Sequence, residues 1–180
     1  MRYLKFQTIF VILMLSLTVR SFASFTENKE EFSVDISVQD LTGSWYKINE
    51  IVTRPDELVN PKVMPYEWIQ FDSEGQYNSV SSSKNLEFTP QSLSKTFSLL
   101  PVTIKYKLKS PVPDIKYLVL DYTDIPNYQE IYSISIVKED SPDKGFELKS
   151  GDLILARVVD LQMPIYVKQF RRLNNTKDTK

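Results

Sequence analysis

The sequence predicts an all-β protein, an antiparallel up-and-down barrel of eight or nine strands. From Leu41 onward, short runs rich in Tyr, Val, Ile, Phe and Thr alternate with turn residues, as in successive β-strands. The chain has no glycine-rich phosphate loop, no internal repeat and no long helical pattern. A meander of this length most simply closes into a barrel, because closure removes its exposed edges. We expect the barrel over residues 41–173, between a polar arm over 24–40 and a polar tail over 174–180.

The expected strands follow one another with short connections. In order they are residues 44–53, 66–71, 76–82, a short strand within 86–97 interrupted at Pro90, 102–108, 115–123, 130–138, 152–158 and 165–173. Asp72–Gly75 is expected to form a tight hairpin turn, with glycine at the position that needs a positive φ. Residues 54–64 form a loop long enough to lie over a barrel mouth, and 139–150 are a polar excursion. A helix over 165–173 is the alternative to the last strand, since Pro164 fits a first helical turn.

The first residues have the features of a secretory signal peptide, expected over residues 1–23. Arg2 and Lys5 supply the positive start, an apolar core follows, and Ser21 and Ala23 place small residues at a cleavage site. The apolar core is too short to cross a membrane, so no transmembrane segment is expected in the mature chain. A retained N-terminal anchor is the alternative. We therefore expect a secreted or periplasmic protein.

The composition excludes several classes of function. The chain contains no cysteine and no histidine, so zinc sites built on these residues, histidine-ligated haem, Ser-His-Asp triads and Cys-His pairs are impossible. We expect no metal and no cofactor. The net charge is −1 for the full chain. Cleavage of the expected signal peptide would remove the positive Arg2, Lys5 and Arg20 and leave a net charge of about −4. That balance gives no reason to expect nucleic acid or an anionic membrane as a partner.

Gly43-Ser44-Trp45-Tyr46 is the most informative motif, because it opens the series of strands. A glycine lets the entering chain turn tightly against its neighbours. The indole two residues later then fills the floor of a closed barrel.

In four segments the chain resembles a lipocalin, within the calycin superfamily, of a bacterial-type or divergent kind. Asp40–Ile48 is similar to the family's opening helical turn and Gly-x-Trp-Tyr; Trp68–Gly75 to the next hairpin; Tyr117–Leu120 with Thr123, Asp124 and Tyr128 to the second motif; and Leu153–Arg157 to the third. The resemblance covers residues 40–158 and departs at residues 125–127, which split the second motif. The 23 residues after Arg157 leave room for a short helix or a closing strand, in place of the family's long C-terminal helix.

The resemblance implies that Arg157 lies across Trp45 at the closed end, so that Gly43, Trp45 and Arg157 form a structural floor with a cation–π contact. An exposed charge at the end of a strand is the alternative for Arg157. The implied function is non-catalytic: binding or transport of a small, mostly hydrophobic ligand, such as a fatty acid or another lipid, inside the barrel.

The candidate ligand-binding residues lie on alternate positions of the expected strands. They are Ile51, Tyr66, Trp68, Tyr77, Ile104, Tyr106, Tyr117 and Val119. If Trp45 points inward, Lys47, Asn49 and Ile51 do so as well, and the polar pair fits a ligand with a polar or anionic head. A local bulge that turns Lys47 and Asn49 out to solvent is the alternative, and a one-residue slip on any strand exchanges its two faces.

Two other functions stay open at this point. The first is a secreted interaction or inhibitor protein whose barrel is filled by its own side chains. The second is an enzyme acting on a lipid, for which Glu50, Glu67, Asp121 and Glu130 are the acidic residues within strands. Nothing pairs these carboxylates at a specified spacing, so we expect most of them to face solvent and assign no catalytic residue.

Overall fold

The computed structural model describes residues 32–55, 64–100, 104–143, 146–159 and 164–174. The expected signal peptide, the first part of the polar arm, most of the loop over residues 54–64 and nearly all of the C-terminal tail lie outside the described residues.

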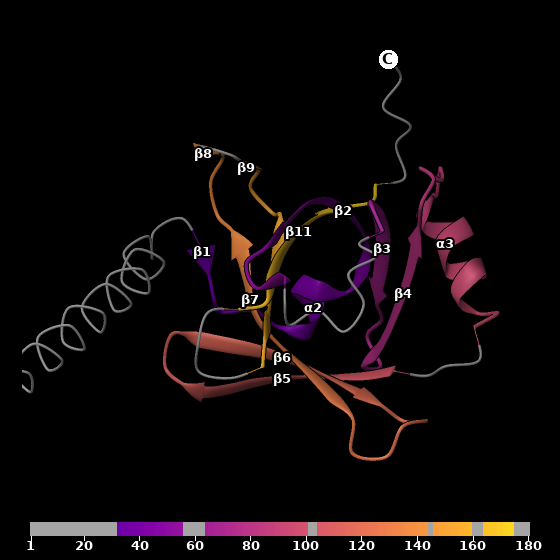
Figure 1. Ribbon diagram of the computed structural model, residues 1–180, viewed down its shortest axis with the longest axis horizontal. Coiled ribbons are helices and arrows are strands. Elements are labelled where there is room, and N and C mark those ends of the chain that lie inside the picture. The colour runs from indigo at the N-terminus through magenta and orange to yellow at the C-terminus, as the bar shows by residue number, and fades with distance from the viewer. Residues whose placement is uncertain (1–31, 56–63, 101–103, 144–145, 160–163, 175–180) are drawn as a thin grey trace, which may run out of the picture.

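Eight strands form a closed antiparallel barrel (Figure 1). They are β2 (Gly43–Val52), β3 (Tyr66–Phe71), β4 (Gln76–Ser82), β5 (Ile104–Val112), β6 (Ile115–Tyr122), β7 (Gln129–Val137), β10 (Leu153–Val158) and β11 (Tyr166–Arg172). Each strand pairs with the next one in this order, and β11 pairs with β2 to close the barrel. The predicted up-and-down barrel is confirmed, and the expected strands agree with it except within residues 86–97.

The expected hairpin between β3 and β4 is present. Gly75 adopts a φ of +83°, a left-handed conformation that favours glycine. The Asp72 carboxylate accepts hydrogen bonds from the backbone N–H groups of Glu74 and Gln76, at 2.9 and 2.7 Å. The aspartate and the glycine therefore fix the turn together, which sets the register of the two strands.

The strand expected within residues 86–97 is wrong, because this segment forms the helix α3 (Pro90–Phe97). Thr89 and Ser92 make a reciprocal capping box, in which each side chain accepts from the other residue's backbone N–H. Proline belongs at the start of such a helix, where its missing N–H costs nothing. Pro90 therefore begins a helix here and does not interrupt a strand.

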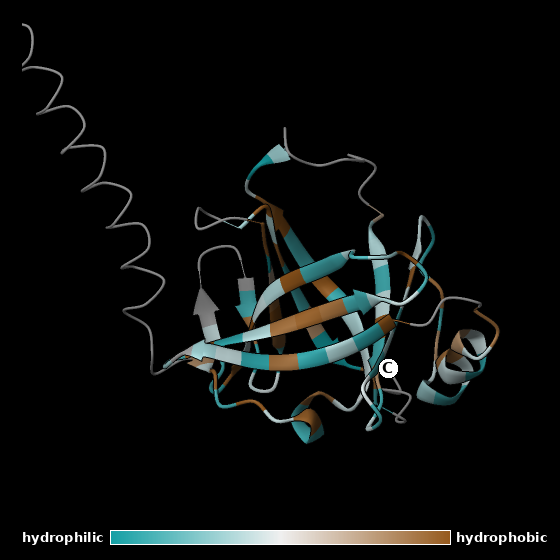
Figure 2. Cartoon of the chain, turned by 90° about the horizontal axis from the view of Figure 1, so that it is seen from below, coloured by the Kyte–Doolittle hydropathy of each residue, from teal (hydrophilic) through white to brown (hydrophobic). Residues whose placement is uncertain are grey.

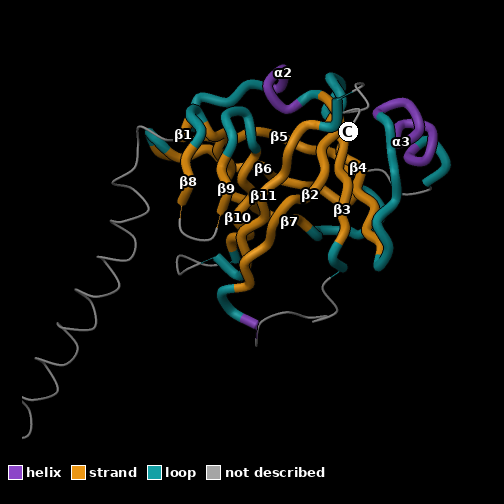
Figure 3. Tube along the Cα trace, turned by 90° about the horizontal axis from the view of Figure 1, so that it is seen from above, coloured by secondary structure: helices purple, strands orange, loops and turns teal. Residues whose placement is uncertain are grey.

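Helix α3 packs on the outer wall of the barrel, next to β4 (Figure 3). Leu93 and Phe97 are one helical turn apart and form an apolar cluster with Trp68 of β3. The Trp68 indole therefore belongs to this outer cluster, which also contains Tyr46 and Tyr66.

The part of the polar arm that the structure describes carries two small elements. β1 (Phe32–Ser33) pairs with β7, and the helical turn α2 (Val38–Leu41) lies across one end of the barrel (Figures 1 and 3). Leu41 is fully buried. We call the end of the barrel at α2 the closed end, and the opposite end the open end.

The C-terminal part of the barrel settles two expectations. Residues 165–173 contain the strand β11, so the favoured strand is confirmed and the helical alternative is wrong. The polar excursion over residues 139–150 contains two short paired strands, β8 (Ser141–Asp143) and β9 (Phe146–Leu148).

The interior of the barrel is apolar at its closed end. Apolar and polar residues alternate along several strands (Figure 2), which is the pattern of a wall with one buried face. Trp45, Phe71, Leu118, Leu153 and Phe170 are each at most 1% exposed. These side chains fill the barrel from five different strands.

Arg172 completes this floor at the end of the last strand. Its guanidinium carbon lies 4.2 Å from the centroid of the Trp45 ring. It donates hydrogen bonds to the carbonyl of Thr42, at 2.9 Å, and to the carbonyl of Asp40. Gly43 has a φ of +132°, and a Cβ at this position would lie 2.9 Å from Arg172 Nη1. Glycine is therefore required here partly to leave room for the guanidinium.

The expected contact between Arg157 and Trp45 is wrong. Arg157 belongs to β10, and its guanidinium lies 5.3 Å from the Tyr132 ring. β2 pairs with β3 and β11, and the register of β11 places Arg172 opposite Trp45. The aliphatic strand that contains Arg157 is the second-last strand of the barrel.

We expect Trp45→Ala to cost about 3–5 kcal/mol of unfolding free energy, because it leaves a large cavity in the floor. Arg172→Ala should cost about 1–2 kcal/mol through the lost ring contact and hydrogen bonds. Chemical denaturation of the single and double variants should give non-additive losses, since the two side chains touch. Arg157→Ala is the matched control, and its loss should add to that of Trp45→Ala within about 0.5 kcal/mol.

Candidate functional site

The predicted lining residues divide between the two faces of the barrel wall. Tyr77, Ile104 and Tyr106 belong to the buried interior cluster, together with Trp45. Tyr106 also donates a hydrogen bond to the carbonyl of Asp72, at 2.8 Å, which ties β5 to the hairpin turn at the closed end. These three residues face the inside of the barrel, as the sequence predicts.

The other five predicted lining residues face outward. Tyr66 and Trp68 pack beneath α3, and Ile51 is 44% exposed. On β6 the interior positions are Leu118 and Leu120, so the alternate positions Tyr117 and Val119 lie on the outer face. On β3 and β6, the predicted inward-facing positions are therefore wrong by one residue.

A bulge explains the phase of β2. The pairing of β11 with β2 shifts between Gln169 and Phe170, so that Phe170 faces Lys47 and Gln169 faces Asn49. Lys47 therefore points inward with Trp45, as expected, while Asn49 and Ile51 turn to the outer face. The bulge considered as an alternative is present: it turns Asn49 outward, as that alternative has it, but it leaves Lys47 inside and turns Ile51 outward.

The open half of the interior holds a cluster of lysine and glutamate side chains. Lys47 Nζ lies 2.5 Å from Glu50 Oε2 and 3.7 Å from Glu67 Oε2. Lys168 Nζ lies 2.7 Å from the same Glu67 oxygen. Lys47 also donates to the carbonyl of Met64, at 2.8 Å. All four charged side chains are at most 16% exposed, so these ion pairs are largely removed from solvent.

A second cluster surrounds Glu130. Its carboxylate accepts hydrogen bonds from the hydroxyls of Tyr132, at 2.8 Å, and Tyr128, at 3.0 Å. The Tyr132 and Tyr166 hydroxyls are 3.0 Å apart. Arg157 Nη2 lies 3.7 Å from Glu130 Oε1. This cluster brings β7, β10 and β11 together at the open half of the barrel.

The two clusters meet at Tyr166, because Lys168 Nζ lies 4.8 Å from the centroid of its ring. Together they form one interior polar network. Its charged members are Lys47, Lys168, Arg157, Glu50, Glu67 and Glu130. Three cations and three carboxylates make this network electrically balanced.

The phenols of the network stay neutral well above physiological pH. Burial, followed by the neighbouring Tyr166 and Glu130, raises the pKa of Tyr132 well above its ordinary value. Burial and then the Glu67 charge do the same to the pKa of Tyr77. The phenols therefore supply hydrogen bonds without adding charge.

One nitrogen of the network has no partner within the described part of the chain. Arg157 Nη1 is buried and donates no hydrogen bond to any carboxylate, carbonyl or hydroxyl oxygen of the described residues. Buried polar groups are nearly always hydrogen-bonded, so such a donor requires an explanation.

The expected solvent exposure of the strand carboxylates is wrong for three of the four. Glu50, Glu67 and Glu130 are 12, 11 and 18% exposed and belong to the interior network. Asp121 lies opposite Gln129 on the outer phase of β6, as expected. The sequence contained the signal for this, since Glu67 and Glu130 each stand two residues from an interior side chain, Ile69 and Tyr132 respectively.

Lys168, Tyr132 and Tyr166 were not identified as candidates from the sequence. Lys168 stands two residues before the interior Phe170, and Tyr132 alternates with Ile134. The strand itself was expected, and knowing that Phe170 faces inward would have placed Lys168 and Tyr166 on the same inner face.

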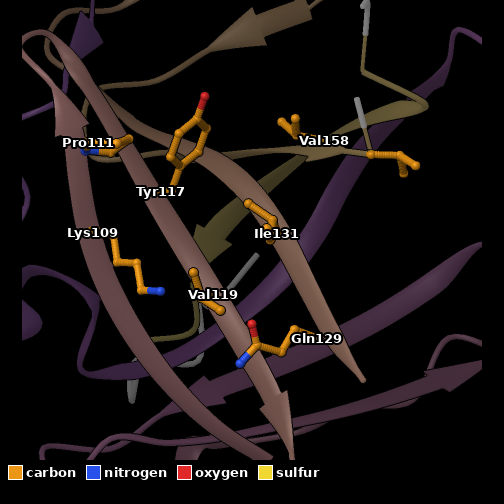
Figure 4. Close-up of a pocket in the computed structure, with 8 residues that line it drawn as sticks. Lys109, Pro111, Tyr117, Val119, Gln129, Ile131 and Val158 are labelled. Carbon is orange, nitrogen blue, oxygen red and sulfur yellow. The ribbon is translucent and has the colours of Figure 1, made fainter. Parts of the chain in front are cut away.

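A separate concavity lies on the outer face of the barrel wall (Figure 4). It has a volume of about 380 Å³ and is mainly apolar. It is lined by Lys109, Pro111, Tyr117, Val119, Gln129, Ile131, Val158 and Val159. Val159 is 59% exposed and Ile131 is 39% exposed, so this surface is open to solvent.

No cluster of Asp or Glu side chains among the described residues is arranged to hold a metal ion. Within the same ranges, no helix has the length and apolar character that a membrane crossing needs. No protein-family model matches the sequence, and neither the curated proteins nor the solved structures contain a significant match.

Alkaline pH should weaken this protein through its interior phenols. Because the folded pKa of Tyr77, Tyr132 and Tyr166 is raised above the ordinary 10.0, their stabilising contribution is complete below pH 10 and is lost as the pH rises further. Burial, the largest single influence, lowers the pKa of Lys168, but Glu67, Tyr166 and Glu50 together outweigh it and raise that pKa, which acts in the same direction. Chemical denaturation between about pH 8 and pH 11 should show the unfolding free energy falling. Tyr132→Phe should make that fall shallower, and an unchanged slope would contradict the buried phenol.

Proposed function

We propose that this protein is an exported, non-catalytic binding protein that takes up a small amphiphilic molecule through the open end of its barrel. The observation that carries the proposal is the interior polar network. Removing charged groups from water costs several kcal/mol per ion, and apolar side chains of similar size would fill the same space without that cost. A charged interior is therefore better explained by binding than by packing.

The network also supports one kind of ligand over others. The closed half is filled by its own apolar side chains, so the ligand belongs at the open half, among Tyr122, Tyr166 and the charged residues. A purely aliphatic ligand would displace water from the charged groups without supplying hydrogen bonds or a charge in its place. We therefore propose a ligand that combines a polar head with an apolar body.

A lipocalin-like ancestry is part of the same proposal. Its support is the helical turn α2, the required Gly43, the buried Trp45 and an arginine stacked on that indole. The resemblance implies such an arginine, and Arg172 has the geometry for the role. Export to a secreted or periplasmic location rests on the sequence of residues 1–23 alone.

An interaction or inhibitor protein is the second candidate. Two observations favour it: the interior side chains bury one another closely, and the outer concavity exposes Ile131 and Val159. The lipid-directed enzyme has less support, because Glu50 and Glu67 are held by lysines and Glu130 by phenols.

A fluorescent fatty-acid probe tests the proposal. The probe should bind stoichiometrically, because burying an apolar chain contributes about 0.8 kcal/mol per CH₂ before the cost of ordering it. Ser79→Trp should weaken binding at least about tenfold, since Ser79 shares the interior face of Ile69 and the indole would occupy the open half.

Asn78→Trp is the matched control, because Asn78 pairs with Gln70 on the outer phase of the same two strands. It should leave binding intact. Val119→Trp fills the outer concavity, and loss of binding in this variant alone would move the site there and favour the second candidate.

A further inference from the structure

The interior cations differ in how far their hydrogen-bonding capacity is used. Lys168 is committed to Glu67, and Lys47 to Glu50 and the Met64 carbonyl. Arg157 keeps a buried nitrogen, Nη1, without a partner in the part of the chain that the structure describes. Of these three residues, Arg157 is therefore the one with a buried nitrogen that makes no hydrogen bond within the described residues.

The neighbours of Arg157 hold it in place without using that donor. Glu130 is already hydrogen-bonded by Tyr132 and Tyr128, and it lies 3.7 Å from Arg157 Nη2, beyond direct hydrogen-bonding distance. The Tyr132 ring supports the guanidinium at 5.3 Å. A guanidinium is a planar donor that matches a carboxylate well, so an unused edge of Arg157 is a suitable partner for one.

The charge balance of the network limits the anion. Three cations and three carboxylates sum to zero, and Glu130 is the carboxylate nearest to Arg157. A dianion such as phosphate would bring two uncompensated charges into a largely buried site, whereas a monoanion brings one. The chemistry of the site therefore favours a single carboxylate.

We infer that Arg157 recognises the carboxylate of a monoanionic amphiphile, through Nη1, at the open half of the barrel. This inference rests on the proposed function and names the class of its ligand. The sequence indicated Lys47 and Asn49 as the partners of a polar head. Arg157 takes that role in this inference, because Lys47 is already bonded to Glu50 and to the Met64 carbonyl.

Competition for the fluorescent probe by dodecanoate and by its methyl ester tests the inference. The ester has the same chain and no charge. A hydrogen bond to a charged group contributes about 1.5–3 kcal/mol, so the native protein should bind the acid about 10- to 100-fold more tightly than the ester. Arg157→Gln should reduce that preference to less than about threefold, mainly by weakening acid binding.

Lys107→Gln is the matched control, since it removes one positive charge from an exposed position on the outer face of β5. The preference for the acid should survive in this variant. Equal binding of acid and ester by the native protein, or a preference that persists in Arg157→Gln, overturns the inference and leaves the binding function standing. Failure of the probe itself to bind the native protein overturns both.

A measurement on the native chain covers the case in which Arg157→Gln does not fold. With ¹⁵N-labelled arginine, the guanidinium resonance that is missing in Arg157→Lys identifies Arg157. That resonance should shift when dodecanoate is added and stay in place when the ester is added. Equal responses to the two compounds would contradict recognition of the carboxylate by Arg157.

Discussion

The contact between Arg172 and Trp45 joins the end of the chain's last strand to the beginning of its first barrel strand. One guanidinium covers the indole and donates to two carbonyls at the end of α2, so helix, first strand and last strand meet at one point. Glycine suits position 43 because its φ is +132° and because a Cβ would lie 2.9 Å from Arg172 Nη1. The indole in turn donates to the Leu41 carbonyl, at 2.9 Å, which leaves its polar atom satisfied although it is fully buried. This arrangement turns Trp45 inward and so determines which residues of β2 line the barrel.

With Trp45 inward, a regular β2 would turn Lys47, Asn49 and Ile51 inward as well. The bulge opposite Gln169 and Phe170 changes this, because Lys47 faces inward before it and Glu50 faces inward after it. A regular strand would have turned Glu50 outward and left the buried Lys47 ammonium without its nearest carboxylate. The bulge thus assembles an ion pair, and through Glu67 and Lys168 it links β2, β3 and β11 inside the barrel.

Much of the architecture could be predicted from the sequence, because strand runs, turns and the Gly43–Trp45 motif are local signals. The hairpin at Gly75 and most of the strands are examples. The position of α3 was missed because a Pro in a β-type stretch was given more weight than the capping pair Thr89 and Ser92. The interior residues were harder to predict, since a one-residue change of phase exchanges Leu118 with Val119 and nothing local fixes that choice. The bulge in β2 depends on pairing with a strand more than a hundred residues away, so its effect on Ile51 was beyond any local pattern.

The direction of the hydrogen bonds around Glu130 gives the open half of the barrel both a donor and an acceptor. Each phenol has a single proton, and Tyr132 donates its proton to the carboxylate. The bond between the two hydroxyls must therefore run from Tyr166 to Tyr132, which leaves lone pairs on the Tyr166 oxygen. Arg157 Nη1 offers an N–H in the same network. The raised pKa of both phenols keeps them neutral, so this arrangement of donor and acceptor persists at physiological pH. It follows from the Glu130 carboxylate, which takes the Tyr132 proton and so fixes the direction of the bond from Tyr166.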